Sequence, residues 1–170
     1  LLARYFAYEL AAVFIADAAG NLTIGGFGGA SQNVVKRAMK SVEYPVIGGV
    51  TGHVFETGEG VVINDVLQDN RYTPIKGWQA GSEMCVAIRE GTKILGIVDV
   101  ESSSRNAFTH NDYIALESLA GILATVITSA DQYQRLQITI SQLRSMQVEL
   151  HDRMEAQRSA ENRLIQAAKL

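Results

Sequence analysis

The apolar positions of the first two thirds of the chain fall into short runs separated by glycine and other turn residues. The predicted strands are 11–16, 22–27, 61–64, 84–89 and 93–100. The first two flank Asp17, Gly20 and Asn21, and the last two flank Glu90-Gly91-Thr92, so each pair is predicted to form a β-hairpin. We expect 61–64 to be a buried strand.

Helical spacing of apolar residues appears between and around these strands. Residues 1–9 have the pattern of the end of a helix, Ser31 can cap a helix that runs to Lys40, and 50–56 predicts a short helix that ends at Gly58. The connection 65–81 is long enough for a functional loop or for a loop that carries a short helix. The glycines of 25–29 lack the residues of a phosphate loop and indicate a bulge or a close backbone approach.

The last third of the chain is predicted to be one long helix. Thr109 and Asp112 match a capping box, and from Asn111 onwards there is no proline and only one glycine, Gly121. At 1.5 Å per residue this helix would be about 90 Å long. Its first half has a wide apolar face, which we expect a sheet to cover.

After Ser129 the apolar face narrows to two columns that repeat every seven residues, which is the pattern of a coiled coil. We call this set the dimer seam: Tyr133, Leu136, Ile140, Leu143, Gln147, Leu150, Met154 and Leu164. A solitary helix of this length needs a partner, so we expect a parallel homodimer. The polar seam residues either let the end of the helix fray or let the coiled coil shift between two packings.

Composition narrows the class of protein. The chain is 47% hydrophobic and 19% charged with a net charge of −3, which indicates a globular protein and argues against nucleic acid as a partner. The single cysteine, Cys85, excludes an intramolecular disulfide and favours a cytoplasmic protein. No apolar run reaches the roughly 20 residues of a membrane span, so we expect no direct membrane contact. The chain does not begin with Met, and a longer parent protein could carry a membrane anchor.

The ordered series of motifs from about Ala11 to Ala130 resembles a GAF domain. The matching residues are Gly48, Gly52, Glu56-Thr57-Gly58-Glu59, Val61 to Val66, Asp69-Asn70-Arg71-Tyr72, Ser82-Glu83, Val86 to Arg89, Leu95-Gly96, Val100-Glu101-Ser102, Phe108-Thr109, Asp112, Leu116-Glu117 and Leu119-Ala120. The resemblance implies an α+β fold: an antiparallel sheet of five or six strands with helices on both faces, and a ligand pocket closed by 29–57 and 66–82. The implied domains are a sensor at 1–130 and a coiled-coil linker helix at 131–170.

Residues 160–170 are similar to the helix that enters the dimerisation and phosphoacceptor module of sensor histidine kinases. The two resemblances together imply the sensor and dimerisation segment of a two-component histidine kinase, with a kinase module and a response regulator as partners. The segment itself is expected to have no catalytic activity, since its three histidines lie on different elements with no paired nucleophile. The alternatives are a structural GAF spacer without ligand, or a GAF regulator of a cyclase, phosphodiesterase or transcription regulator.

Several side chains could contact a small-molecule ligand in the implied pocket. The candidates are Phe27, His53, Phe55, Asn64, Asp65, Arg71, Tyr72, Trp78 and Met84. An arginine and aromatic side chains in a pocket lid would suit an anionic or planar molecule, but Tyr72 and Trp78 could equally pin the loop to the core. Asp65 is more simply explained as the cap of the turn that follows it.

The residues of this chain match the cofactor-binding residues of known GAF relatives poorly. Covalent bilin attachment and haem binding are disfavoured, because the loop 72–81 has neither the cysteine nor the histidine that those relatives use. Reduction of methionine sulfoxide needs several cysteines, whereas Cys85 is alone and is better explained as a small buried hydrophobe. Glu101-Ser102 replaces the Asn-Lys of cyclic-nucleotide-binding relatives. The identity of the ligand is left open.

Overall fold

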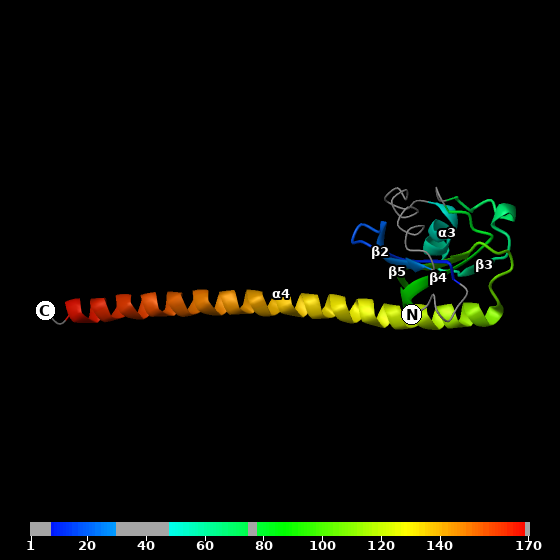
Figure 1. The fold of residues 1–170 in the computed structure, drawn as a ribbon. Helices are drawn as coiled ribbons and strands as arrows, with labels where there is room; N and C mark the ends of the chain where they lie inside the picture. The colour runs from blue at the N-terminus through cyan, green and yellow to red at the C-terminus, as the bar shows by residue number, and fades with distance from the viewer. Residues whose placement is uncertain (1–7, 30–47, 75–77, 169–170) are drawn as a thin grey trace. The chain divides into compact units, whose positions relative to one another are not determined.

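The structure is a computed structural model that describes residues 8–29, 48–74 and 78–168 (Figure 1). Its elements are β1 (Leu10–Ala16), β2 (Leu22–Gly29), α3 (Gly49–Thr57), β3 (Val61–Ile63), the 3-10 helix η1 (Val66–Gln68), β4 (Ser82–Glu90), β5 (Lys93–Ser102) and α4 (His110–Ala167). The chain forms two compact units, Leu1–Ile127 and Thr128–Leu170.

The five strands of the first unit form one sheet in the order β2-β1-β5-β4-β3, with every neighbouring pair antiparallel. Both predicted hairpins are confirmed. β1 and β2 are joined through Asp17, whose carboxylate accepts backbone hydrogen bonds from Ala19 and Asn21 at 2.8 Å each. β4 and β5 are joined by Gly91-Thr92, where Gly91 has the left-handed φ of 59° that such a turn requires.

The two faces of the sheet carry different helices (Figure 1). α3 covers one face, where Val50 and Val54 are buried against strand residues such as Cys85 and Ile97. The first turns of α4 cover the other face, where Leu116 is buried against Val86. We name these the α3 face and the α4 face. The sequence prediction of an α+β fold with helices on both faces of a five-stranded antiparallel sheet is therefore confirmed.

The glycine and capping residues predicted from the sequence end α3, begin α4 and interrupt the pairing of β1 with β2. Gly58 ends α3 with a φ of 74°, and its backbone N–H donates to Val54. The Thr109 side chain accepts from the Asp112 backbone N–H at 3.3 Å, and the Asp112 carboxylate accepts from the Thr109 backbone N–H at 2.7 Å. The pairing of β1 with β2 shifts by one residue at Gly25, as expected of a strand glycine.

Three sequence expectations about these elements need correction. Strand β3 is not buried throughout: Val62 is exposed and only Ile63 is fully buried, because β3 lies at the edge of the sheet. Tyr8 and Glu9 are not helical, although a helix was expected to reach Glu9. The sheet does not cover the whole apolar face of α4, since Ile122 and Val126 are more than half exposed. The helix expected from Ser31 to Lys40 lies outside the described residues.

The second unit, taken by itself, is helical from Thr128 to Ala167. Large apolar side chains along it are strongly exposed, with values from 52% at Ile138 to 70% at Leu164. By length and composition alone α4 is long and apolar enough to cross a membrane, contrary to the sequence expectation. One such helix is weak evidence for a span, since core helices of soluble proteins satisfy the same criteria.

Candidate functional site

Three carboxylic acids are buried together on the α3 face of the sheet. Glu83 comes from β4, and Asp99 and Glu101 come from β5; their exposed fractions are 4%, 4% and 2%. We call these residues the acidic trio. Buried acids that lack a cationic partner are rare in protein interiors because the loss of hydration opposes ionisation.

The strand register brings the trio together. Glu83 is the cross-strand partner of Glu101, and Asp99 is the partner of Cys85. Cys85 belongs to the apolar cluster under α3, so its partner Asp99 faces the same way. Side chains two positions apart in a strand share a face, which places Glu83 and Glu101 on that face as well. The three carboxyls therefore occupy neighbouring positions of one surface.

Burial and mutual repulsion raise the pKa of each member of the trio. Burial is the main cause for Glu83 and Glu101, whose pKa values rise to about 8, and a neighbouring carboxylate adds to both shifts. The pKa of Asp99 is also raised well above its usual range, by burial and then by Glu83. Because two acids that face each other resist double ionisation, the trio retains protons at neutral pH.

The hydrogen bonds within the trio leave one oxygen without a partner. Glu83 and Asp99 share a side-chain hydrogen bond. The other carboxyl oxygen of Asp99, Oδ1, is buried and accepts no hydrogen bond from the described residues. Within that part of the chain the trio also forms no ion pair. A buried acceptor of this kind is costly unless a donor reaches it.

Two aromatic side chains from the loop between η1 and β4 lie beside the trio. The Trp78 indole N–H donates to Glu101 Oε2. The Tyr72 hydroxyl lies near the Ala80 backbone N–H without forming a well-aligned hydrogen bond, and its pKa is raised to about 12 by burial and then by the charge of Glu101. Trp78 and Tyr72 pack against the apolar cluster under α3, so they are at once core residues and neighbours of the acids.

Arg71, whose positive charge acts on Glu83, has a partner of its own. Its guanidinium contacts Asp69 through two nitrogens, at 2.9 Å and 2.6 Å. This hydrogen bonding is the main reason that the pKa of Asp69 falls to about 2. Arg71 acts on Glu83 only through its charge, as the last of the causes that set the pKa of that residue. The bidentate pair is a preorganised structure of the loop rather than a counterion of the trio.

The remaining predicted site residues are divided between the α3 face and other places. Phe55 is half-buried against the cluster under α3. His53 is half-buried on α3, and its charge contributes to the low pKa of Asp69. Phe27 lies on β2 opposite Ala12 and is 47% exposed. These three residues surround or border the face that carries the trio.

Asn64 and Asp65 have structural roles. The Asn64 backbone carbonyl accepts from the Asn106 backbone N–H at 2.9 Å. The Asp65 carboxylate caps η1 by accepting from the Leu67 backbone N–H at 3.2 Å, as the capping interpretation predicts. It also forms an ion pair with Arg105 at 3.3 Å.

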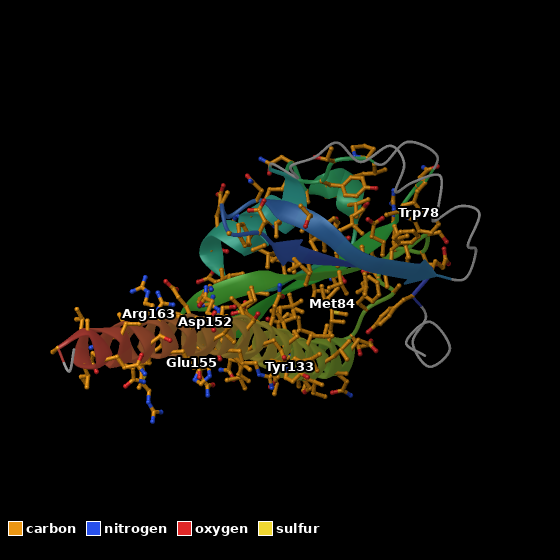
Figure 2. All side chains as sticks on the ribbon, turned by 90° about the vertical axis from the view of Figure 1, so that its left-hand side faces the viewer. Trp78, Met84, Tyr133, Asp152, Glu155 and Arg163 are labelled. Carbon is orange, nitrogen blue, oxygen red and sulfur yellow. The ribbon has the colours of Figure 1, made fainter. Side chains whose placement is uncertain are left out.

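The placement of Met84 in the pocket is wrong. Met84 is fully buried on the α4 face, because alternation along β4 turns it away from Glu83 and Cys85. Figure 2 shows Met84 on the side of the sheet that faces α4, and Trp78 on the other side. Cys85, on the α3 face, is a buried residue as expected, and its thiol pKa is raised by burial and then by Asp99.

Glu83, Asp99 and Glu101 were missed as site residues, although two of them belong to the motifs of the resemblance. A signal was present in the sequence: Asp99 and Glu101 alternate with Val98 and Val100 inside a strand. Alternate acids in an otherwise apolar strand place charge on one of its two faces. What the sequence lacked was the information that this face is also buried.

The comparisons with known proteins identify the class of the chain. The sequence model of the GAF domain family matches residues 2–128. The chain therefore belongs to the GAF domain family. A comparison with curated proteins found no match.

Solved structures of GAF folds agree with this assignment. A free methionine-R-sulfoxide reductase from Neisseria meningitidis, in complex with its substrate, has a TM-score of 0.62 at 22% identity, with 75% of this chain and 71% of that one covered. The type II enzyme from Thermoplasma acidophilum has a TM-score of 0.59 at 20% identity, covering 72% and 80%. The GAF domain of a phosphoenolpyruvate-protein phosphotransferase from Coxiella burnetii has a TM-score of 0.62 at 19% identity, covering 74% of each chain. At these identities the likeness shows the fold alone.

The chemistry of Cys85 does not fit a thiol-based reductase. A sulfoxide-reducing thiol attacks as the thiolate and then needs a second thiol to resolve the product. Cys85 is the only cysteine of the chain, it is fully buried, and its raised pKa holds it as the thiol. Cys85 therefore lacks both the thiolate character and the second thiol that such a reductase uses.

Proposed function

We propose that this chain is a regulatory sensor segment in which the GAF domain binds a small molecule at the acidic trio and α4 joins two copies. The observation that carries the proposal is the trio itself. Three buried carboxyls without an ion-pair partner among the described residues destabilise the ligand-free fold. A ligand that satisfies them gains binding free energy that a filled apolar core could not provide.

The dimer is supported by the apolar side chains that α4 leaves exposed. In the second unit the seam residues Tyr133, Leu143 and Met154 are each about 60% exposed. Ile122 and Val126, which precede them in the same two heptad columns, are 62% and 58% exposed. Val126 and Ile140 share one column and the leucines dominate the other, a combination that favours two parallel helices. We infer that the seam begins at Ile122, not after Ser129.

The parent protein is proposed to be a sensor histidine kinase on the basis of residues 160–170. In that arrangement the occupied GAF domain would bias two packings of the coiled coil, and the packing would set kinase activity. Polar residues in the two heptad columns, such as Gln147 in the seam and Gln157 further along, lower the free-energy cost of such a shift. The kinase module, the response regulator and the cytoplasmic location are parts of this proposal.

A pair of matched variants tests the dimer. Leu143 lies in the seam, whereas Val148 lies outside both columns, and their exposed fractions are 59% and 62%. In sedimentation equilibrium, Leu143→Asp is expected to shift the chain to monomer, and Val148→Asp is expected to leave the dimer intact. If the unsubstituted chain were a monomer at high micromolar concentration, or if the two variants had equal effects, the proposed seam would be contradicted.

The sensor role is tested in two further ways. Native mass spectrometry of the chain purified from cells is expected to show a retained small molecule that is absent from Glu101→Gln. Insertion of one residue after Leu143 in the full-length parent shifts the seam register and should lock its output in one state. Unchanged regulation after that insertion, with no retained molecule, would favour a ligand-free structural spacer instead.

A further inference from the structure

We infer that the coiled coil formed by α4 contains a built-in weak segment. Two copies of the chain pair firmly along 133–143, whereas like charges face each other across the seam along 147–161 and hold that segment close to opening. This inference rests on the proposed dimer, and it specifies where and why the packing of the two helices changes.

The two columns of the seam are bordered by two rows of flanking residues. One row precedes the column of Tyr133 and Ile140, and the other follows the column of Leu136 and Leu143. In a parallel coiled coil a residue of the first row meets a residue of the second row on the other helix, and these pairs set the choice of partner. The flanking pairs of two identical copies are Gln132 with Gln137, Thr139 with Arg144, Met146 with His151, Arg153 with Arg158, and Ala160 with Ile165.

Along 133–143 the seam offers nothing that opposes pairing. Its columns are filled by one aromatic and three aliphatic side chains: Tyr133, Leu136, Ile140 and Leu143. Three of these side chains are more than half exposed on the single helix, so their burial drives association. The first charged flanking residue, Arg144, meets the uncharged Thr139. Pairing of this part therefore has no electrostatic cost across the seam.

Along 147–161 the charged flanking residues are basic. Arg153 meets Arg158 of the other helix, and this pair occurs twice because the two copies are identical. Like charges that face each other across an interface repel and disfavour the complex. Acids are present in this segment, but they are exposed and lie outside both flanking rows, too far round the helix to bridge the two copies: Glu149, Asp152 and Glu155.

The two arginines are poorly neutralised on their own helix. Arg153 forms an ion pair with Glu149 at 2.5 Å, but the two side chains are 76% and 63% exposed. Exposed ion pairs of this kind contribute little. Arg158 forms no ion pair with any residue of 8–29, 48–74 or 78–168. Most of the positive charge therefore remains at the edge of the seam.

The columns also become polar in the same segment. Glu161 continues the column of Met154, and Gln157 continues the column of Leu150. On the single helix the Gln157 amide donates to the Glu161 carboxylate at 3.1 Å. In a dimer the two Glu161 side chains would face each other inside the seam, where removing like charges from water is costly. Repelling flanks and polar columns thus coincide along the helix.

A weak segment that follows a firm one suits a signalling helix. The open and closed arrangements of 147–161 differ little in free energy, so a small bias from the GAF domain is sufficient to change their populations. Firm pairing along 133–143 keeps the two copies together in both arrangements.

Reversal of one charge tests the inference. Arg158→Glu turns both arginine pairs into ion pairs between the helices, whereas the charges along its own helix are the same in monomer and dimer. In sedimentation equilibrium of the complete chain at low ionic strength, we expect the dissociation constant to fall about fivefold or more. Arg163→Glu makes the same change of charge outside the columns and the flanking rows, and should change the dissociation constant less than about twofold.

A double variant separates a specific pair from a general effect of charge. Arg153→Glu alone is also expected to strengthen the dimer, because it too creates ion pairs with Arg158. Arg153→Glu combined with Arg158→Glu restores like charges across the seam. The double variant is therefore expected to return the dissociation constant to about that of the unsubstituted chain, which is the non-additivity of residues in contact.

Hydrogen exchange locates the weak segment. When exchange is followed by mass spectrometry at concentrations where the chain is dimeric, we expect the amides of 147–161 to exchange about tenfold or more faster than those of 133–143. Arg158→Glu is expected to slow exchange in 147–161 selectively. Fraying from the end of the helix would not depend on the sign of the charge at this position.

The possible results separate this inference from the proposed function. A dimer in which 147–161 is as well protected as 133–143 would overturn the weak segment and leave the proposed dimer intact. Equal effects of Arg158→Glu and Arg163→Glu, or additive effects of the two reversals in the double variant, would overturn the electrostatic cause. A chain that stays monomeric even with Arg158→Glu would overturn both the inference and the proposed dimer.

Discussion

The α3 face and the α4 face are made by the same strands but have opposite chemistry. On the α4 face, β4 and β5 contribute mainly apolar residues such as Val86 and Val98, which pack against Leu116. On the α3 face, the residues next to them along the chain include the acidic trio. The α4 face stabilises the domain through close packing, whereas the α3 face carries buried groups that weaken it. Such a cost in an otherwise regular fold points to the face that has a function.

Truncation on the α4 face should have the largest effect on stability. Met84 is completely buried between the sheet and α4 (Figure 2), so Met84→Ala would leave a cavity. We expect a loss of about 2–5 kcal/mol in the free energy of unfolding, measured by urea denaturation. A loss below about 1 kcal/mol would show that the α4 face is not the main core.

Neutralising one acid on the α3 face should have the opposite sign. The pKa of Glu101 is about 8 in the folded chain, above the value of an exposed glutamate, so the folded state binds more protons than the unfolded state between those two values. The unfolding free energy therefore falls as pH rises from about 4.5 to about 8. Glu101→Gln should flatten this dependence and stabilise the ligand-free chain by at least about 1 kcal/mol at pH 8, with little change below pH 4.5.

Thermal unfolding followed at several pH values measures this effect. Glu90→Gln is the matched control, since Glu90 is exposed on the same strand as Glu83. If the melting temperature of the unsubstituted chain rose from pH 5 to pH 8, the assignment of raised pKa values to the trio would be contradicted.

The cap of α4 should have a smaller effect, of about 1 kcal/mol. Thr109→Ala removes the hydroxyl that accepts from the Asp112 backbone N–H. Thr109→Ser keeps that acceptor and serves as the control. The two variants are compared by thermal denaturation; equal stability would mean that the hydroxyl contributes nothing and that α4 is held by its packing alone.

The Arg71–Asp69 pair should have the smallest effect on stability. Asp69→Asn removes the charge at the edge of the α3 face, and because this pair is partly exposed we expect a loss within about 1 kcal/mol. The folded pKa of Asp69 is about 2, so the stabilisation is present above the unfolded value and is lost as pH falls through about 2 to 4. A melting temperature that is independent of this substitution at pH 7 but altered at pH 2 would contradict this sign.

The sequence by itself determined those features that depend on local chemistry. Turn residues such as Asp17 and Gly91 defined the hairpins, Gly58 ended α3, and Thr109 with Asp112 started α4. The ordered motifs also identified the GAF fold. These signals were sufficient because capping and turn formation involve residues only a few positions apart.

Only the tertiary structure decided which face of β4 and β5 is covered by α4 and which carries the acidic trio. Met84 and Glu83 are neighbours in the sequence, yet one lies in the core under α4 and the other in the acidic trio. Alternation separates them, but which side is covered, and by what, depends on the distant helices α3 and α4. The pairing of Glu83 with Glu101 depends in turn on the register of two strands. Charge that is unremarkable along the chain becomes costly only when packing removes it from water.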